Sequence, residues 1–451
     1  MRIEQLRGRS VAILGGGVEG RAVLEVLGQS IGLDKITVLD EQPLRSMDNV
    51  ATRSGPLASL PLTEFDVIVR SPGVSIYRPE LEAARRAGVQ FTSGTSLWLA
   101  EGPGAPVIAV TGTKGKSTTT SLIGHLLAGL GQTVLLGGNL GQPVISFLKE
   151  PTPDWFVVEL SSYQLADLQG KVDFAVLTNL LSDHIDWHGS IEIYHRDKLR
   201  LLSMSRHQTL AHATDKKVTG IPSNVQWAGD EESWKVTDEG VFNQGKQVAT
   251  FDGWDLPGRH NLNNLELALA TLEVCGANVA DALPNISSFK ALPHRLQPVM
   301  ASPVACVNDS IATTPDATVA ALRCFPKQAL VLIVGGVERQ QVWGGLIGEI
   351  VERLKRGWDT HVVVQGEGRE RLLTELAASV AEPQRHLSES LNQATEVALD
   401  LAMGLSTDDP TAEGEDVVVL LSPGAPSFDQ FRDFTERGEQ FSRQCVRRLT
   451  T

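Results

Sequence analysis

The segment VTGTKGKSTTT, residues 110–120, places glycines, lysines and a serine in the order used by ATP-binding loops. The apolar run PVIA precedes it and SLIGHLLAGLG follows, so the loop joins a predicted strand to a predicted helix. In that context backbone N–H groups can cradle phosphates, Lys116 can reach the β and γ oxygens, and Ser117 can hold Mg²⁺. The spacing G-x-x-G-K-S is shorter than the usual G-x-x-x-x-G-K-[ST]. We predict an ATP loop; the alternative is a turn rich in glycine and threonine with a solvated lysine.

A second glycine loop, LGGGVEG, follows the first predicted strand. Gly15, Gly17 and Gly20 fit G-x-G-x-x-G, and Asp40 ends the next strand. Small residues let the backbone approach a pyrophosphate at a helix N-terminus, and the acid can bind a ribose. The pattern therefore predicts a nucleotide phosphate site, and a tight turn between strand and helix remains the alternative.

A third cluster lies in NLLSDHIDWHGSIEIYHRDKLR, residues 179–200. Asp183, His184 and Asp186 are close in sequence, and Lys198 follows on a predicted helix. Carboxylates and an imidazole can organise Mg²⁺ beside an ATP γ-phosphate. Glu159, at the end of the predicted strand in VVELSSYQL, is a further candidate metal ligand. A solvated acidic turn with a surface lysine, and an acid that caps a helix start, remain the alternatives.

The elements that must position these clusters are short β-branched runs alternating with helix-length segments, the pattern of parallel α/β sheets. Three series of strands can be separated, with EGPGAP (101–106) between the first two and a turn-rich stretch, about 206–254, that predicts a small antiparallel patch. The predicted strands are VAILG, ITVLD, DVIVR and VQFTS; PVIAVTG, TVLLGG, WFVVELS and FAVLTN; and PVACVNDS, ALVLIVGG, THVVVQG and DVVVLLSPG.

Length and composition limit the class of protein. With 451 residues, the chain is long enough for roughly three domains. The longest apolar runs have strand length, and the N-terminal run ends in glycines, so we expect neither a membrane span nor a signal peptide, and a cytoplasmic protein. A net charge of −14 argues against a nucleic-acid binder. The four cysteines are scattered, which indicates neither a zinc site nor a disulfide framework.

In this order and spacing, the three clusters resemble those of the Mur ligase family, ATP-dependent enzymes that add amino acids to the cytoplasmic peptidoglycan precursor. TGTKGKST resembles the family's ATP loop, VVELSSYQL its following strand, and residues 179–200 its metal and lysine segment. GRHNLNN (258–264), with His260, resembles its central ATP segment, and PHRLQP (293–298) opens its third domain. The C-terminal stretch LLSPGAPSFDQFRDFTERGEQF (420–441) is similar to the branch that adds D-glutamate.

The resemblance implies roles for individual residues. Lys116, His184 and Lys198 would be catalytic, and Ser117, Glu159, His184 and a carbamylated Lys198 would hold two Mg²⁺. Lys114 stands where the family usually has asparagine; it would either add a contact to phosphate or point into solvent, and solvent is slightly favoured. ATP would contact Gly112, Thr113, Lys114, Gly115, Lys116, Ser117, Thr118, Asn261, Asn264, Arg295 and Asp309. The UDP-linked substrate would contact Gly15, Gly17, Gly20, Asp40, Ser71, Pro72, Gly73 and Asn139.

For the incoming amino acid the resemblance implies Thr313, Arg339, Ser427 and Phe434. Ile311 and Arg339 stand at or near positions where many glutamate-adding relatives have lysine, so one cation is lost and another altered. We expect D-glutamate, with Arg339 carrying more of its recognition, and L-glutamate is the alternative.

The architecture that follows is α/β with three domains: a Rossmann-like domain for UDP over 1–93, a central P-loop-type ATPase sheet with a small antiparallel patch over 94–292, and a Rossmann-like glutamate domain over 293–451. The implied substrate is UDP-N-acetylmuramoyl-L-alanine, activated by ATP as an acyl phosphate, and we expect a monomer. The rival classes are a nicotinamide-dependent oxidoreductase, a non-catalytic nucleotide-binding protein and another amino-acid ligase, such as a folylpolyglutamate synthase.

Overall fold

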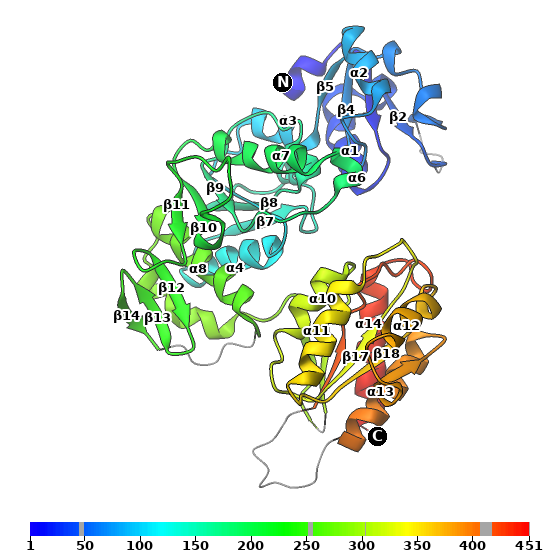
Figure 1. Ribbon diagram of the computed structural model, residues 1–451. Coiled ribbons are helices and arrows are strands. Elements are labelled where there is room, and N and C mark those ends of the chain that lie inside the picture. The colour runs from blue at the N-terminus through cyan, green and yellow to red at the C-terminus, as the bar shows by residue number, and fades with distance from the viewer. Residues whose placement is uncertain (45–48, 251–255, 303, 406–416, 451) are drawn as a thin grey trace. The chain divides into compact units, whose positions relative to one another are not determined.

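The structure is a computed structural model that describes residues 1–44, 49–250, 256–302, 304–405 and 417–450. Packing divides the chain into two compact units: Met1–Gly253 with His260–Phe289, and Trp254–Arg259 with Lys290–Thr451. In the described residues the chain forms two parallel sheets, one small antiparallel sheet and one mixed sheet (Figure 1). The predicted α/β class is confirmed. The first two predicted segments each hold a sheet but pack as one unit, and the domain boundaries stay predictions.

The first sheet is parallel, with the order β3-β2-β1-β4-β5. Its central strand alternates between two cores: Val11 and Ile13 pack with residues of α1, whereas Ala12 and Leu14 pack with Leu81 of α2. Burial on both faces is why these strands read as continuous apolar runs. The elements are β1 (Val11–Leu14), α1 (Val18–Ile31), β2 (Ile36–Asp40), β3 (Ala51–Ser54), β4 (Val67–Arg70), α2 (Pro79–Arg86), β5 (Gln90–Thr92) and α3 (Gly94–Glu101).

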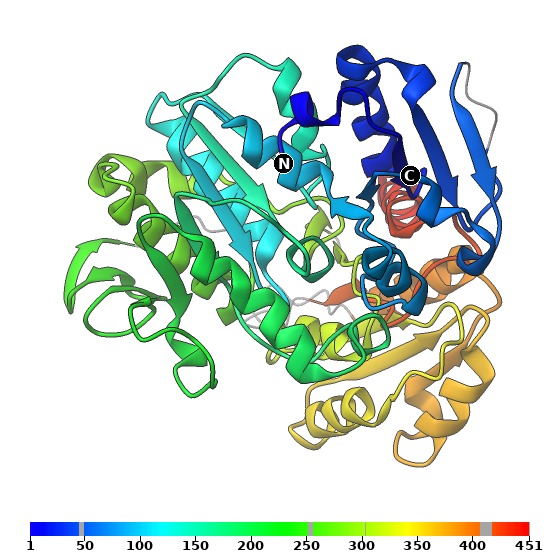
Figure 2. The ribbon, with the colours of Figure 1, turned by 90° about the horizontal axis from the view of Figure 1, so that it is seen from above.

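The second sheet belongs to the same unit and has the order β11-β10-β9-β6-β8-β7. Leu201 and Leu202 of α7 join the core that includes Val107 and Ala109 of β6, and α4 packs against β6, β7 and β8 (Figures 1 and 2). The strands are β6 (Val107–Thr111), β7 (Val134–Gly138), β8 (Trp155–Glu159), β9 (Phe174–Leu177), β10 (Thr209–His212) and β11 (Gln226–Ala228). The helices are α4 (Lys116–Gly129), α5 (Ser162–Leu165), α6 (Ile185–His188), α7 (Ile191–Met204), α8 (Arg259–Val274) and α9 (Val279–Ala282).

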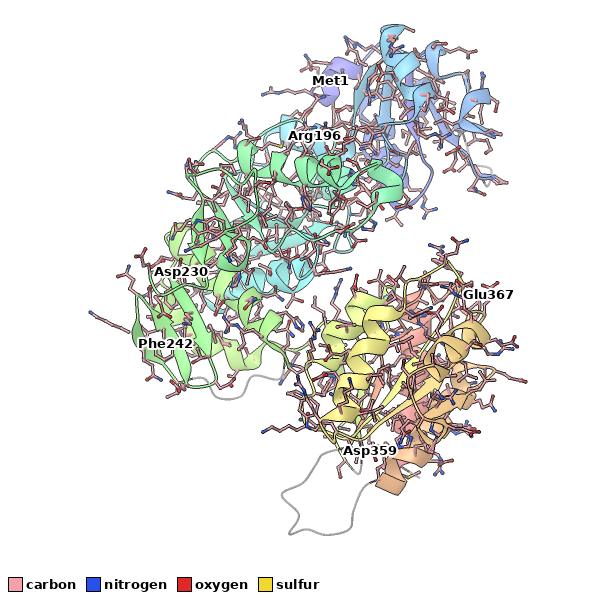
Figure 3. All side chains as sticks on the ribbon, viewed as in Figure 1. Met1, Arg196, Asp230, Phe242, Asp359 and Glu367 are labelled. Atoms are coloured by element: carbon pink, nitrogen blue, oxygen red, sulfur yellow. The ribbon has the colours of Figure 1, made fainter. Side chains whose placement is uncertain are left out.

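The turn-rich stretch is only partly antiparallel. β12 (Trp234–Thr237), β13 (Gly240–Asn243) and β14 (Lys246–Ala249) form the predicted patch, and Phe242 marks its middle strand in Figure 3. β10 and β11 lie in the same stretch but extend the parallel sheet, because β10 pairs with β9. The end of the predicted patch, 251–254, lies outside the described residues.

The second unit contains one mixed sheet, in the order β15-β16-β20-β17-β18-β19, in which β15 is antiparallel to β16. Leu330 and Leu332 of β17 face a core shared with α10–α12, and Val331 and Ile333 face one shared with α13 and α14. The strands are β15 (Gln297–Met300), β16 (Ala305–Asn308), β17 (Leu330–Val334), β18 (Thr360–Val364), β19 (Arg385–Leu387) and β20 (Val418–Leu421). The helices are α10 (Pro315–Leu322), α11 (Gly344–Lys355), α12 (Arg369–Ala377), α13 (Leu391–Leu405) and α14 (Phe434–Thr450).

Within the described ranges, none of the helices has the length and apolar character that crossing a lipid bilayer requires.

Candidate active site

The predicted ATP loop connects β6 to α4, as its strand-loop-helix context requires. Gly115 caps the helix with a left-handed backbone (φ 81°), and a Cβ there would collide with the Asn264 side chain. The loop is also held from β9: Thr178 Oγ1 donates to the Lys114 carbonyl at 2.6 Å, and Asn179 Oδ1 accepts from Lys114 N at 2.9 Å. The conformation of Gly115 and the hydrogen bonds from Thr178 and Asn179 give the loop one defined shape before a ligand binds.

Lys116 is the first residue of α4 and lies over this loop. Its Nζ donates to the Thr113 carbonyl at 2.9 Å, so the ammonium stays beside the loop backbone. Thr113 Oγ1 accepts in turn from Tyr194 Oη at 3.0 Å. A lysine held at the N-terminus of a helix supplies positive charge where that helix already favours an anion.

Glu159, at the end of β8, is buried and both its oxygens have partners. Ser117 Oγ donates to Oε2 at 2.6 Å, and Asn139 Nδ2 donates to Oε1 at 2.6 Å. Three predicted site residues, two of them assigned to metal and one to the UDP-linked substrate, are thereby brought together. The hydroxyl and carboxylate are hard oxygen donors of the kind that Mg²⁺ takes.

Lys198, on α7, is almost fully buried against the same loop. Its Nζ donates to the Gly112 carbonyl at 2.6 Å and lies 4.9 Å from the centre of the Tyr194 ring. Burial lowers the pKa of Lys198 well below its ordinary value, and the charge of Lys116 lowers it further. The surface-lysine alternative is therefore wrong, and a neutral amine is chemically accessible at this position.

The side chains of Asp183, His184 and Asp186 do not converge on one point where they could bind a metal together. Asp183 pairs with Lys114 at 3.2 Å, and the Lys114 side chain stays about half exposed, so the expectation that it points into solvent stays a prediction. His184 has a left-handed backbone (φ 52°), and its Nδ1 lies 2.8 Å from Tyr163 Oη. Burial lowers the pKa of His184, whereas Asp183 raises it. Asp186 is exposed. In the described residues no group of three or more His, Cys, Asp or Glu side chains is arranged to hold a metal.

Sequence reasoning missed a buried polar network next to Lys198. Asp197 Oδ2 accepts from Tyr77 Oη at 2.6 Å and lies 2.9 Å from His188 Nδ1, whose Nε2 lies 3.0 Å from Ser162 Oγ. Arg196, labelled in Figure 3, donates to Tyr77 Oη at 2.8 Å. Burial raises the pKa of Tyr77 to about 12. The network connects a loop of the first sheet to α7. No periodic pattern in the sequence predicts that these residues meet.

A buried arginine joins the first two sheets at the loop after β4. Arg70 Nε and Nη2 donate to the Asp167 carboxylate at 2.8 and 2.6 Å. Its Nη1 donates to the carbonyls of Ser71, Pro72 and Val74 at 3.1, 3.2 and 2.7 Å. The guanidinium thus fixes the shape of the RSPGVS loop while it anchors that loop to the second sheet.

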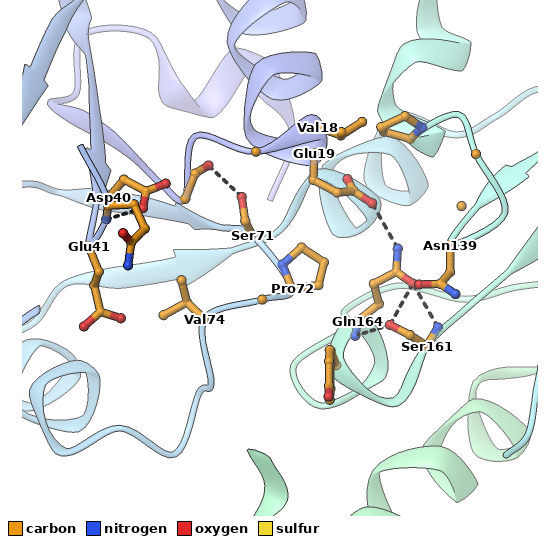
Figure 4. Close-up of a pocket in the computed structure, with 18 residues that line it drawn as sticks. Val18, Glu19, Asp40, Glu41, Ser71, Pro72, Val74, Asn139, Ser161 and Gln164 are labelled. Atoms are coloured by element: carbon orange, nitrogen blue, oxygen red, sulfur yellow. Dashed lines mark hydrogen bonds between the residues drawn. The ribbon is translucent and has the colours of Figure 1, made fainter. Parts of the chain in front are cut away.

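A cavity of about 620 Å³ opens beside this loop (Figure 4). Most residues predicted for the UDP-linked substrate line it: Gly15, Gly17, Asp40, Ser71, Pro72, Gly73 and Asn139. Gly20 does not; it lies under the loop, where a Cβ would collide with the Gly15 carbonyl oxygen. Both oxygens of Asp40 accept backbone N–H groups, from Gly16 at 2.7 Å and Gln42 at 2.8 Å.

Glu19 and Gln164 also line this cavity and were not predicted. A signal for Gln164 was present, since S-x-x-Q at Ser161 forms the capping box that begins α5. Glu19 occupies an unconstrained position of G-x-G-x-x-G, so the fingerprint gives it no role.

The remaining ATP predictions fall in both units. Asn264 lies beside the loop, where its Oδ1 accepts from Thr119 Oγ1 at 3.2 Å and its Nδ2 donates to Asn261 at 3.3 Å. Arg295 and Asp309 belong to the second unit. Asp309 is buried, with Oδ2 accepting from Ser422 Oγ at 2.8 Å, and burial raises its pKa to about 7.

The predicted glutamate residues follow neighbouring strands of the second unit. Thr313 comes after β16, Ser427 after β20 and Arg339 after β17, which are adjacent in the sheet and parallel, so all three lie at its carboxyl edge. The Arg339 guanidinium lies 5.7 Å from the centre of the Phe428 ring, and that ring is exposed. The Phe434 carbonyl accepts from Ser310 Oγ at 2.7 Å.

Comparison with known proteins matches both units. The Mur ligase middle domain matches residues 110–272, and the Mur ligase, glutamate ligase domain matches residues 294–424. A protein of Xanthomonas euvesicatoria pv. vesicatoria named UDP-N-acetylmuramoyl-L-alanine--L-glutamate ligase is 38% identical over 463 residues, which cover 98% of this chain and 96% of the relative. The chain belongs to the Mur ligase family.

Two further relatives of this Mur ligase extend the comparison. A protein of Salinispora tropica with the same name as the Xanthomonas protein is 35% identical and covers 99% of each chain. The solved structure of UDP-N-acetylmuramate-alanine ligase MurC from Thermotoga maritima aligns with a TM-score of 0.60 at 17% identity, over 98% of this chain and 99% of that one. The family resemblance predicted from the loops is confirmed, and the fold is that of a Mur ligase.

Proposed function

We propose that this ligase uses ATP to join L-glutamate to UDP-N-acetylmuramoyl-L-alanine in peptidoglycan precursor synthesis. The supporting observation is identity of 38% to a relative named for that reaction, across 98% of the chain. The match therefore includes the second unit, where residues for the incoming amino acid are expected. The oxidoreductase alternative leaves both the ATP loop and this full-length match unexplained. Against a non-catalytic protein stands the joint presence of the four residues expected to be catalytic or metal-binding: Lys116, Glu159, His184 and Lys198.

The stereochemistry that we propose differs from the one predicted from the sequence. The C-terminal motif favoured D-glutamate, with L-glutamate as the alternative, whereas relatives from Xanthomonas and Salinispora are both named for L-glutamate. Ile311 and Arg339 stand at or near positions where many glutamate-adding relatives have lysine, so the positive charges that would orient the substrate carboxylates lie at different places. Because stereochemistry depends on where charges lie around the α-carbon, we now propose the L-isomer.

The reaction would run in two steps. The substrate carboxylate attacks the γ-phosphorus, forming the acyl phosphate and releasing ADP; the glutamate amine then attacks the carbonyl carbon, loses its proton and expels phosphate. Both reactants of the first step are anions, so positive charge must be held between them. Lys116, fixed by Thr113 at 2.9 Å, is our candidate for that charge.

Magnesium would be held by Ser117, Glu159, His184 and a carbamylated Lys198. The residues fit this ion, because Ser117 and Glu159 offer hard oxygen atoms 2.6 Å apart and the buried Lys198 amine would gain an anionic oxygen as a carbamate. When bound, the ion would polarise phosphoryl oxygens and neutralise their charge. His184, with a pKa lowered by burial, would remain neutral and able to ligate.

The test is phosphate release from ATP and Mg²⁺ with UDP-N-acetylmuramoyl-L-alanine, comparing L-glutamate, D-glutamate and a panel of other amino acids. We expect at least ~10-fold higher kcat/KM for L-glutamate than for its enantiomer, the factor that about 1.4 kcal/mol of discrimination gives. Preference for D-glutamate or for an amino acid without a side-chain carboxylate would reject the substrate assignment. No release with any acceptor would reject the ligase assignment.

A further inference from the structure

The cavity proposed for the UDP-linked substrate contains a carboxyl group, that of Glu19, at a place where an anion is expected. Glu19 is the second residue of α1 (Val18–Ile31) and lines the cavity beside Gly17 and Ser71. Figure 4 shows its side chain directed toward Gln164, whose Nε2 donates to Glu19 Oε1 at 3.1 Å. The carboxyl group is thus held in place at the start of the helix that would face the diphosphate.

The cavity offers no cation to offset this acid. In the described residues, its lining contains the carboxylic acids Glu19, Asp40 and Glu41 but neither lysine nor arginine. Asp40 accepts two backbone N–H groups, and Glu41 lies at the cavity rim, where Arg78 pairs with it at 3.4 Å. An ionised Glu19 would therefore repel a bound diphosphate, in surroundings less polar than bulk water.

Other titratable groups around α1 do not relieve the conflict. Tyr163 of α5 lines the cavity, and burial raises the pKa of its phenol to about 12. Lys149 ends the 3-10 helix Val144–Lys149 that packs on α1, but it pairs with Glu25 at 2.6 Å. The Glu19 carboxyl group also lies near Gly94 at the start of α3, a residue without charge.

We propose that Glu19 is protonated when the UDP-linked substrate is bound, and that its carboxyl O–H then donates a hydrogen bond to a diphosphate oxygen. The inference rests on the proposed function, because it takes the ligand to be a nucleoside diphosphate conjugate. The helix N-terminus favours a single anion. When Glu19 is protonated and neutral, the diphosphate is the only negative group at that position. Glu19 is then a binding residue whose protonation sets the affinity.

The chemistry of Glu19 is consistent with this role. Burial raises the pKa of its carboxyl group to about 7, and the hydrogen bond from Gln164 opposes the shift. Below that pH the free protein already carries the proton; above it, substrate binding must take one up. Affinity should therefore fall as pH rises through this range, by up to ~10-fold for each further pH unit.

The decisive experiment is calorimetric titration of the full-length protein with UDP-N-acetylmuramoyl-L-alanine, without ATP, at pH 6 and pH 8.5. The diphosphate diester and carboxylate of this probe do not titrate in that interval. For the wild type we expect affinity at least ~10-fold weaker at pH 8.5, and proton uptake of roughly 0.7 per site near pH 7.5 that rises toward one at pH 8.5, measured in buffers of different ionisation enthalpy. Glu19→Gln, a neutral hydrogen-bond donor, should bind with less than ~3-fold pH dependence and more tightly than wild type at pH 8.5.

The matched control is Glu25→Gln, the same substitution on the same helix at an exposed glutamate paired with Lys149. It should keep the wild-type pH dependence. Wild-type pH dependence in Glu19→Gln, or binding by the wild type without proton uptake, would overturn the inference; the second measurement holds even if the variant does not fold. Absence of binding at pH 6 would instead reject the substrate assignment on which the inference rests.

Discussion

Ser117 and Glu159 are joined by a 2.6 Å hydrogen bond from Ser117 Oγ to Glu159 Oε2, between the first turn of α4 and the end of β8. The bond places a hydroxyl and a carboxylate, both hard oxygen donors, at the carboxyl edge of the second sheet, where open α/β sheets bind ligands. The pair is therefore the part of the proposed magnesium site that the chain has already assembled.

Glu159→Gln should raise the Mg²⁺ concentration needed for half-maximal activity by at least ~10-fold, because an amide oxygen carries no negative charge for the ion. Titration of phosphate release with Mg²⁺ measures the effect. Glu150→Gln, at an exposed glutamate, is the control and should titrate like the wild type. An unchanged requirement in Glu159→Gln would remove Glu159 from the metal site.

Lys116→Ala should lower kcat by ~10²-fold or more while the fold is retained, because the lysine would neutralise charge that grows during phosphoryl transfer. Steady-state kinetics and circular dichroism of the purified variant test both parts. Lys171→Ala, which removes an exposed lysine bonded to the Ser203 carbonyl, controls for the general loss of a positive charge. Near-normal turnover of a folded Lys116→Ala protein would show that the loop does not bind ATP as proposed.

Lys198→Ala should be inactive and regain part of its activity with acetate or formate, which can supply the oxygen that a carbamate would provide. Lys198→Arg should not be rescued as well, because its positive charge is permanent. Wild-type protein equilibrated with ¹³C-labelled CO₂ should give a carbamate signal that Lys198→Ala lacks. Full activity of Lys198→Ala without additives would contradict the role proposed for this lysine.

Arg339→Ala should raise the KM for glutamate by at least ~10-fold and leave the KM for ATP within about 2-fold, since a charge-assisted bidentate contact would be lost. Arg339→Lys should be intermediate because an ammonium cannot form that contact. Arg323→Ala, at an exposed arginine paired with Glu349, is the matched control on the same unit. An equal rise in both KM values would indicate a structural role for Arg339 instead.

Most strands that are buried on both faces could be predicted from the sequence, with β10 the exception because it lies in the turn-rich stretch. β1, β6 and β17 are continuous apolar runs and were predicted, whereas β3 (ATRS) is largely exposed and β19 (RHL) is short, and both were missed. An edge strand needs few apolar residues, because a neighbouring strand supplies its backbone partners on one side and solvent covers the other. Apolar composition alone therefore misses some of the edge strands of these sheets.

For the candidate site, the residues in contiguous loops were predictable and the residues that meet across the fold were not. Lys116 and Ser117 could be predicted because they belong to the G-x-x-G-K-S pattern. Tyr77 and Asp197 are 120 positions apart, and nothing in either local segment requires the other. The ion pair of Lys114 could not be predicted for the same reason, because its partner Asp183 is 69 positions away.

Arg70 carries one further consequence. Its guanidinium holds three carbonyls of the loop that borders the substrate cavity, and it is anchored by a carboxylate of the second sheet. The entropy of ordering that loop is thus lost when the chain folds and not when a ligand arrives. This wall of the cavity is therefore ordered in advance, so a small fragment such as UDP alone would not have to order it on binding.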